Sequence, residues 1–216
     1  DESRENEGDL IIPASKVTAK SINFMAKYGR GLICLALTQS QANKLNLSLM
    51  SSTNNSRTQT AFTISIDAKK GISTGISAHD RALTIKTAIK KKVSEKDLVK
   101  PGHVFPLVSK NGGVLVRAGH TEASVDVSKL SKCGASGVIC EIMNDDGTMA
   151  RGKQLFNFTK RHKLKLGKID DLISYRLNRE KLIRFKKSSL IKIKDQKYNI
   201  NIYENLLDGS ENFALI

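Results

Sequence analysis

An acidic segment near the start of the chain concentrates carboxylate groups. Glu5, Glu7 and Asp9 lie within five residues of one another, beside Arg4. Carboxylate oxygens are the ligands that hard divalent cations prefer, so this density suits a metal ion. A solvated acidic turn has the same composition, because clusters of charged residues usually lie at the surface. The segment is therefore a candidate metal site, with an ordinary surface loop as the alternative.

A second candidate is the segment Arg-Ala-Gly-His-Thr at residues 117–121. The small residues Ala118 and Gly119 let backbone N–H groups approach an anion. Arg117 can hold a phosphate through two parallel hydrogen bonds, and His120 can bind a metal through one ring nitrogen. With Thr121 adding a hydroxyl group, the segment could bind an anionic substrate and a cation together.

Two further side chains could transfer protons. His103 lies between two prolines in Pro-Gly-His-Val-Phe-Pro, a stiff loop that could hold an imidazole in place for proton transfer. A histidine held by a structural hydrogen bond is the alternative. Glu141 ends the apolar run 137–141, and a carboxylate that leaves a buried strand is either paired or functional, because burying it alone is costly. We expect Cys34, inside an apolar segment, to be inert packing rather than a nucleophile.

The chain is strongly basic, with 36 Lys and Arg against 21 Asp and Glu in 216 residues and a formal charge of +15. Residues 1–150 hold 20 basic and 14 acidic side chains, whereas residues 151–216 hold 16 and 7, so the excess is concentrated towards the C-terminus. Neither a recognition helix nor interleaved basic and aromatic residues are evident. We interpret the excess as a solvated surface whose field also attracts small anionic substrates, with a basic nucleic-acid-binding protein as an alternative.

Other features of the sequence exclude several classes of protein. No stretch approaches ~18 uninterrupted apolar residues and no signal peptide opens the chain, so we expect no association with a membrane. Three cysteines without CxxC spacing suit neither a disulfide framework nor an all-thiolate zinc site, which indicates the reducing cytoplasm. GxxxxGK and GxGxxG motifs are both absent, so neither kind of nucleotide-binding loop is predicted.

Hydrophobic patterns predict helices and strands that alternate through about residue 180, as in a layered α/β or α+β domain. Pro101 and Pro106 mark residues 100–106 as a loop, and a turn signal at residues 111–113 leaves at most a short strand between the two. Further along, residues 190–194 and 198–203 alternate apolar with polar side chains and predict a hairpin. Strands are otherwise predicted at residues 10–12, 31–37, 61–67, 114–116 and 137–142, and helices at residues 15–28, 39–45, 81–92, 121–132, 153–162 and 169–178.

Together these segments resemble the 3,4-dihydroxy-2-butanone 4-phosphate synthase family. The resemblance covers residues 1 to about 179. Six motifs carry it, in the order of the family: Arg-Glu-Asn-Glu-Gly-Asp at 4–9, Ala-Phe-Thr-Ile-Ser-Ile-Asp at 61–67, Gly-Ile-Ser-Ala-His-Asp-Arg at 75–81, Pro-Gly-His-Val-Phe-Pro-Leu at 101–107, Gly-Gly-Val-Leu-Val-Arg-Ala-Gly-His-Thr-Glu-Ala at 112–123 and Cys-Glu-Ile-Met-Asn-Asp-Asp-Gly-Thr-Met-Ala-Arg at 140–151.

The resemblance implies a compact, layered α/β (α+β) domain with a mixed sheet, in a cytoplasmic homodimer whose active sites lie near the subunit interface. It implies a lyase of riboflavin biosynthesis that converts D-ribulose 5-phosphate to L-3,4-dihydroxybutan-2-one 4-phosphate and formate, with neither nucleic acid nor membrane as a partner. Glu5 and His120 match the ligands of a Mg²⁺ (or Mn²⁺) cofactor, while His103 and Glu141 match the two essential acid/base positions. The family's substrate-binding positions match Arg4, Glu5, Asp9, Arg117, Ala118, Gly119, His120, Thr121 and Glu141.

The C-terminal segment carries a second resemblance, because residues 181–216 look like the opening strands of GTP cyclohydrolase II. We therefore expect a synthase domain at residues 1–179 and the start of a GTP cyclohydrolase II-like domain at residues 180–216, as in a bifunctional riboflavin-biosynthesis protein truncated at both ends. The zinc-binding cysteines of the second family are not reached, so GTP hydrolysis is not expected of this chain. A catalytically degenerate paralogue that acts as an interaction module is a further alternative.

Overall fold

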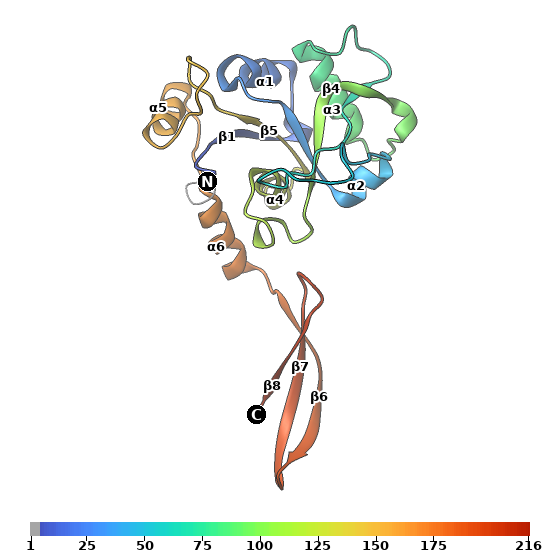
Figure 1. Cartoon of the computed structure of the whole chain (residues 1–216), viewed down its shortest axis with the longest axis vertical. Helices are drawn as coiled ribbons and strands as arrows, with labels where there is room; N and C mark the ends of the chain where they lie inside the picture. The colour runs from blue at the N-terminus through green and yellow to red at the C-terminus, as the bar shows by residue number, and fades with distance from the viewer. Residues whose placement is uncertain (1–4) are drawn as a thin grey trace.

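A five-stranded mixed sheet forms the centre of the protein in the computed structural model, which describes residues 5–216 (Figure 1). The strands lie side by side in the order β1-β5-β2-β4-β3. Only β2 and β4 run parallel to each other, and the other neighbours are antiparallel. This mixed sheet confirms the predicted α/β (α+β) class. The strands are β1 (Asp9–Pro13), β2 (Cys34–Thr38), β3 (Ile66–Ala68), β4 (Leu98–Ser109) and β5 (Ser136–Glu141).

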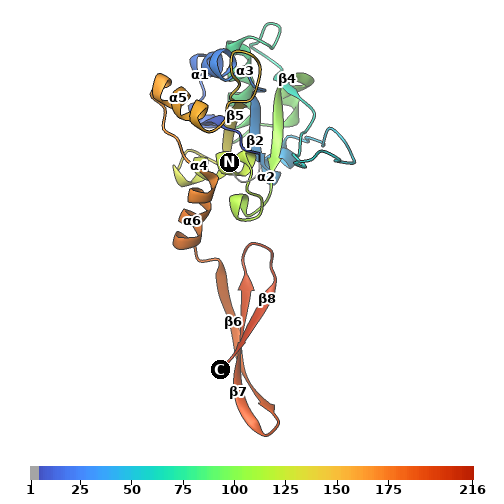
Figure 2. The same cartoon turned by 60° about the vertical axis from the view of Figure 1, so that its left-hand side comes forward.

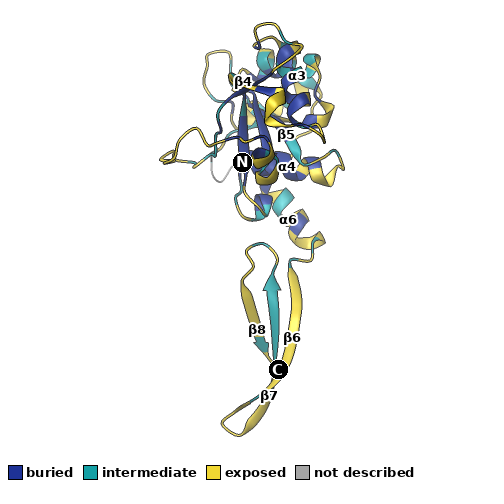
Figure 3. Cartoon of the chain, turned by 90° about the vertical axis from the view of Figure 1, so that its right-hand side faces the viewer, coloured by how far each residue is buried: buried dark blue, intermediate teal, exposed yellow. Residues whose placement is uncertain are grey.

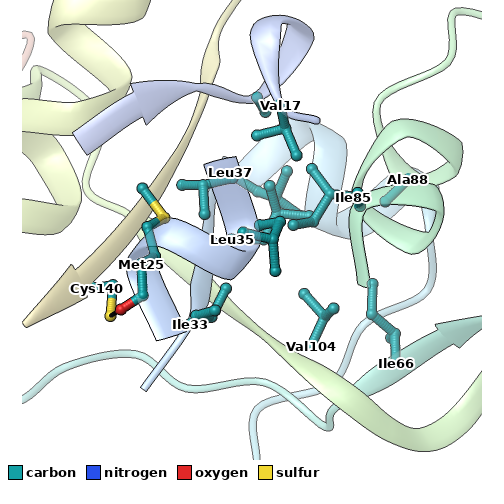
Figure 4. Close-up of a cluster of buried hydrophobic side chains, with 14 of the residues drawn as sticks. Val17, Met25, Ile33, Leu35, Leu37, Ile66, Ile85, Ala88, Val104 and Cys140 are labelled. Carbon is teal, nitrogen blue, oxygen red and sulfur yellow. Dashed lines mark hydrogen bonds between the residues drawn. The ribbon is translucent and has the colours of Figure 1, made fainter. Parts of the chain in front are cut away.

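The main hydrophobic core lies on one face of this sheet. Leu35 and Leu37 of β2 are fully buried there and form one cluster with Val138 and Cys140 of β5 (Figure 4). Their neighbours along the strands, such as Cys34 and Ile139, point to the opposite face, because successive side chains of a strand alternate. The continuous apolar run of β2 is thus explained by burial on both faces, as its sequence predicts.

Helices flank the sheet, and side-chain caps fix where several of them begin. Thr18, Thr38 and Ser77 each accept a hydrogen bond from a backbone N–H in the first turn of the helix that follows. The predicted helix at 15–28 therefore begins only at Ala19, and it ends in a π-helical turn, η2 (Met25–Gly29). The α-helices are α1 (Ala19–Phe24), α2 (Gln39–Lys44), α3 (Ala78–Ala88), α4 (His120–Leu130), α5 (Lys153–His162) and α6 (Ile169–Arg179), with 3₁₀ turns η1 (Ala14–Lys16), η3 (Glu95–Asp97) and η4 (Gly113–Leu115).

Strand β4 is the largest departure from the prediction, since residues 100–106 belong to a single strand of 12 residues. Pro101 is tolerated because pairing with β3 is interrupted there. Ile66 pairs with Val104 but Asp67 pairs with Val99, so residues 100–103 bulge out of the ladder. Pro106 contributes to the sheet through its carbonyl group, which accepts a hydrogen bond from the backbone N–H of Thr63.

Two other predicted strands are also wrong in part. The strand predicted at residues 114–116 is not found: Gly113–Leu115 form the 3₁₀ turn η4, because the backbone N–H of Val114 donates to the buried carboxylate of Asp126 rather than to a neighbouring strand. Of residues 61–67, only the end belongs to β3. The residues before it form isolated bridges, in which Phe62 pairs with Leu107 and Thr63 pairs with Leu49.

A separate three-stranded antiparallel sheet follows α6 and extends away from the first sheet (Figures 1 and 2). Its strands are β6 (Ile183–Ile193), β7 (Gln196–Asn205) and β8 (Glu211–Leu215), and β6 with β7 form the predicted hairpin. Large apolar side chains such as Leu190 and Phe213 are exposed on it. In Figure 3 most of β6 has the colour of exposed residues. In the part of the chain that the structure describes, no helix has the length and apolar character needed to cross a bilayer.

Candidate functional site

An open cleft of about 980 Å³ lies over the face of the sheet opposite the main core. Its floor is made by alternate residues of β1, β5 and β2, whose neighbours along each strand face the core. The long loop before β3, the segment after η4 and the start of α4 form its walls. The residues that line it are Glu5, Asn6, Glu7, Asp9, Cys34, Arg57, Thr58, Gln59, Thr60, Phe62, Leu107, Lys110, Val116, Arg117, His120, Thr121, Ile139, Glu141 and Arg151.

Sheet register brings two predicted site residues together on this floor. Asp9 of β1 is the direct partner of Glu141 of β5, and cross-strand partners on one face have Cβ atoms about 5 Å apart. His120, the first residue of α4, joins them: its Nδ1 lies 3.7 Å from Oδ1 of Asp9 and 3.4 Å from Oε2 of Glu5. Arg4, predicted to bind substrate, falls outside the described residues.

The cluster carries unbalanced negative charge. Burial raises the pKa of Asp9 to about 7, and the charges of Glu141, Glu5 and Glu7 add to this rise, although His120 opposes it. Burial lowers the pKa of His120, but a hydrogen bond with Glu5 and the charge of Asp9 outweigh it, so that the pKa of His120 is raised overall. The carboxylates therefore favour a positive charge among them, whether a proton or a cation.

A backbone hydrogen bond holds the side chain of Glu141 at the C-terminal end of β5. Its Oε2 accepts a hydrogen bond of 2.8 Å from the N–H of Leu32. Gly31 permits this approach, because a Cβ atom there would lie 2.6 Å from both the backbone N and the backbone O of Glu141. The carboxylate that the sequence marks as leaving a buried strand therefore faces the cleft in one fixed position.

Arg117 is engaged differently from its predicted role. Its Nη1 donates to Oε2 of the buried Glu122 at 2.6 Å, and its Nη2 donates to the carbonyl of Thr58 and the hydroxyl of Thr60. The guanidinium group therefore ties the long loop of residues 51–60 to α4, with much of its hydrogen-bonding capacity in use. Ala118 faces an apolar cluster around Val114 and is not among the residues lining the cleft, and neither is Gly119.

Three cations that the sequence analysis did not single out line the same cleft: Arg57, Lys110 and Arg151. Nη2 of Arg151 lies 3.8 Å from Oε1 of Glu7. Because Arg57 and Lys110 belong to loops that only the fold brings together, no local pattern marks them. Arg151 closes the last of the six motifs and could have been found there. These cations would favour an anionic group at the outer part of the cleft.

His103 is not among the residues that line the cleft. It lies in the bulge of β4, where its Nδ1 is 2.7 Å from Oδ2 of Asp67 and its side chain is 42% exposed. Within one subunit, the structure therefore brings Glu141 to the cleft but leaves the other predicted acid/base residue outside it.

The donors present fit a divalent cation with few protein ligands. Glu5 and His120 are close together, and a cation beside them would offset the negative charge of the neighbouring carboxylates of Asp9, Glu7 and Glu141. Among residues 5–216, no group of three or more His, Cys, Asp or Glu side chains converges as a complete ligand set. Glu5 and His120 therefore stay a predicted pair of metal ligands, with donor atoms that suit a divalent cation.

Fold and site together define an α/β protein whose mixed sheet carries a cleft with carboxylate and imidazole groups at its floor and cations at its rim. Residues 1–175 match the model of the family "3,4-dihydroxy-2-butanone 4-phosphate synthase", so the chain belongs to this family.

Known proteins agree with this assignment. The riboflavin biosynthesis protein RibBA of Aquifex aeolicus is 54% identical over 217 residues, which cover the whole chain and 53% of that protein. The crystal structure of RibBX, a two-domain synthase from A. baumannii, superimposes with a TM-score of 0.91 at 42% identity, over all of this chain and 64% of that one. A synthase solved with two magnesium ions gives a TM-score of 0.78 at 39% identity, over 83% and 88%. The chain thus spans about half the length of the Aquifex protein.

These relatives support an enzyme of riboflavin biosynthesis. They lend no support to the nucleic-acid-binding alternative or to the degenerate interaction module.

Proposed function

We propose that this chain converts D-ribulose 5-phosphate to L-3,4-dihydroxybutan-2-one 4-phosphate and formate, as a lyase of riboflavin biosynthesis. The observation that carries the proposal is the cluster of Glu5, Asp9, His120 and Glu141 at the floor of one cleft, built from segments far apart in the sequence. Membership of the synthase family supplies the reaction, and the cleft supplies acidic groups beside cations for a phosphorylated sugar.

The cofactor in this proposal is Mg²⁺ or Mn²⁺, held by Glu5 and His120. A bound divalent cation would polarise the sugar oxygens and make a neighbouring C–H group more acidic. A related synthase crystallised with two magnesium ions supports the choice of metal.

The chain's own residues would bind the sugar and move its protons. Arg4, Asp9, Arg117, His120 and Thr121 bind and orient the substrate, with Arg57, Lys110 and Arg151 adding positive charge near its phosphate. The predicted positions Ala118 and Gly119 do not line the cleft, and in this proposal they shape the backbone that carries their neighbours. Glu141 exchanges a proton with the substrate through the carboxylate oxygen that Leu32 does not bind. Cys34 lines the floor only as a neutral thiol, because burial raises its pKa well above the usual range.

His103 fits this reaction if the protein is a homodimer. Its imidazole is partly exposed and lies outside the cleft of its own subunit, so it can reach a substrate only in the cleft of another subunit. We therefore propose a dimer in which each active site combines Glu141 from one chain with the partner's His103. We also propose a cytoplasmic location, since the three cysteines are all free.

For domain organisation, we propose a synthase domain at residues 1–179 and the beginning of a GTP cyclohydrolase II-like domain at residues 180–216. The separate sheet β6-β7-β8, with its exposed apolar side chains, supports a boundary after α6. This chain alone is not expected to hydrolyse GTP.

The reaction is tested by incubating the chain with ribulose 5-phosphate and measuring formate together with the four-carbon phosphate. The wild type is expected to give both in equal amounts. Glu141→Gln keeps the shape of the side chain and is expected to fold but to lose formate release by about 10²-fold or more. Near-normal turnover of this variant would remove Glu141 from the mechanism.

The shared site is tested by mixing two inactive variants, His103→Ala and Glu141→Ala, after joint refolding. Random pairing should restore about a quarter of the wild-type sites, because half of the dimers are mixed and each contains one complete site. Activity in neither the single variants nor the mixture would contradict a site shared between subunits.

A further inference from the structure

We propose that the chain has a second small-molecule site, separate from the cleft, which binds a mononucleotide through its base and its phosphate. The site is a cavity of about 450 Å³ between the π-helical turn η2, the hairpin after β5 and helix α5. It shares no lining residue with the cleft. The inference is therefore independent of the reaction proposed above.

Three aromatic rings from two distant segments line this cavity, those of Tyr28, Phe158 and His162. The ring centroid of His162 lies 4.7 Å from that of Tyr28 and 4.5 Å from that of Phe158. A fourth ring, that of Phe24, packs against His162 at 5.2 Å. These contacts hold the rings in place without a ligand, and preformed aromatic groups of this kind stack with the bases of nucleotides.

Helix α5 adds two polar side chains to the same cavity. Asn157 and Arg161 lie one turn apart on α5, each directly before one of the lining rings, Phe158 and His162. Among the residues that the structure describes, neither side chain has a hydrogen-bond or ion-pair partner. An amide can both donate and accept, as the edge of a base requires, and a guanidinium group can hold a phosphate through two parallel hydrogen bonds. One face of α5 thus offers groups for both parts of a nucleotide.

The backbone around Arg30, another lining residue, is held in an unusual conformation. Arg30 directly follows η2 and has a φ of 70°, in the left-handed region that residues other than glycine rarely adopt. Its guanidinium group donates to the carbonyl of Met143 at 2.8 Å and pairs with Asp145, so the charge of this carboxylate is compensated. Strained backbone and π-helical turns both occur preferentially at functional sites.

Asp146 is the other carboxylate that lines the cavity. Its Oδ1 accepts hydrogen bonds from the backbone N–H and the hydroxyl of Thr148, which lower its pKa. The ionised carboxylate is an acceptor that suits the amino group of a base, as in the readout of cytosine by acidic side chains.

The combination of groups favours a mononucleotide over simpler ligands. A bare anion would use Arg161 but none of the rings, and an apolar molecule would leave Arg161 and Asn157 without partners. The cavity volume is within the range of sites that enclose one small molecule. A single nucleotide therefore fits the site in size as well as in chemistry.

The test is calorimetric titration of the full chain at pH 7.5, without Mg²⁺, with AMP, GMP, CMP and UMP. We expect at least one of them to bind at one site per chain with a Kd below about 1 mM. Its nucleoside and inorganic phosphate should each bind at least ~10-fold more weakly, because each lacks half of the contacts. Excess ribulose 5-phosphate should not displace the nucleotide, because the cleft is a separate cavity. Failure of all four nucleotides to bind would overturn the proposal, and so would displacement by ribulose 5-phosphate.

Two substitutions separate the contacts with the phosphate from those with the base. Arg161→Gln should weaken binding of the nucleotide about 10-fold or more and leave binding of the nucleoside unchanged. His162→Ala should weaken binding of both about 5- to 100-fold, because a stacking partner is lost.

Lys160→Gln is the matched control, since it removes a charge from the same end of α5 at a residue that does not line the cavity. It should bind the nucleotide like the wild type. Equal weakening in Lys160→Gln and Arg161→Gln would refute a specific phosphate contact. If His162→Ala does not fold, Arg161→Gln decides alone, because the side chain that it changes is exposed. The titrations require no turnover, so a chain that releases no formate would still uphold or refute this site.

Discussion

At the scale of single residues, the position of Glu141 depends on Gly31, which has no side chain to displace it. Gly31→Ala would place a methyl group 2.6 Å from the backbone of Glu141 and against its carboxylate, so that strand or side chain must shift. We expect at least a ~10-fold loss of kcat and a loss of about 1–3 kcal/mol in the free energy of unfolding. Steady-state kinetics and urea denaturation measure these two effects.

Gly167→Ala is the control for this variant, because a Cβ atom at Gly167 meets no other atom within 4 Å. It should retain both kcat and stability. Wild-type kcat in Gly31→Ala would show that the fixed position of Glu141 does not matter for turnover.

The three cysteines should differ in reactivity. Burial raises the pKa of Cys34 beyond its usual range and that of Cys140 to about 12, whereas Cys133 is partly exposed. Because the thiolate is the reactive form, iodoacetamide at pH 8 should modify only Cys133 in the folded chain and all three cysteines after denaturation. Peptide mass spectrometry gives the result. Rapid modification of Cys34 would mean that the floor of the cleft holds a nucleophilic thiolate.

Local sequence revealed the acidic half of the candidate site better than the basic half. Asp9 and Glu141 are recognisable because each adjoins an apolar strand, and the strand register then brings them together. Arg57 and Lys110 adjoin no such pattern, because loops without periodicity acquire their positions only in the fold. The prediction that Arg117 binds a phosphate could not include its hydrogen bond to the carbonyl of Thr58, because this contact joins residues far apart in the sequence.

At the scale of elements, a buried guanidinium group ties α6 to α4, beside an apolar cluster that includes Ile169 of α6 and Ala123 of α4. Nη1 of Arg176 donates to Oδ2 of Asp126 on α4 and to the carbonyl of Gly112, both at 2.7 Å, while Nε donates to Glu180. Arg176→Ala should lower the free energy of unfolding by roughly 3 kcal/mol, because the buried carboxylate of Asp126 then loses the positive charge of Arg176. Urea denaturation followed by circular dichroism measures the change.

An exposed ion pair provides the comparison. On β6, Arg184 donates a hydrogen bond to Glu204 of β7, but its side chain is largely exposed to solvent. Arg184→Ala should therefore lower the free energy of unfolding by less than about 1 kcal/mol. Equal losses in the two variants would refute the view that Arg176 anchors α6.

Helices were predicted from the hydrophobic pattern with different success at their ends. The helix predicted at 153–162 matches α5 residue for residue, whereas the helix predicted at 81–92 is found at Ala78–Ala88, because Ser77 caps it three residues earlier. Strand β4 could not be predicted, because the bulge that accommodates Pro101 depends on pairing with β3, a partner more than thirty residues away in the chain. Likewise, the 3₁₀ turn η4 depends on Asp126, a residue that acts only through the tertiary structure.

At the scale of the whole molecule, the C-terminal sheet should be dispensable for the synthase reaction. Residues 183–215 pair among themselves and extend away from the five-stranded sheet (Figure 2), and none of them lines the cleft. A chain ending at residue 179 is expected to keep kcat within about twofold of the full chain. It should also be more soluble than the full chain, because exposed apolar side chains such as Phe213 are removed. Formate release and size-exclusion chromatography compare the two chains. Loss of activity on truncation would place part of the active site, or of the dimer interface, in the second sheet.

The most direct test of the account measures formate release from ribulose 5-phosphate by the full chain with Mg²⁺, after chelation, and after Mg²⁺ is restored. If Glu5, Asp9, His120 and Glu141 form a metal-dependent active site, formate should appear with Mg²⁺, fall to background with chelator and return on addition of the metal. Formate release that is unaffected by chelation would contradict the metal site. No formate from a folded chain under any of the three conditions would contradict the proposed reaction itself.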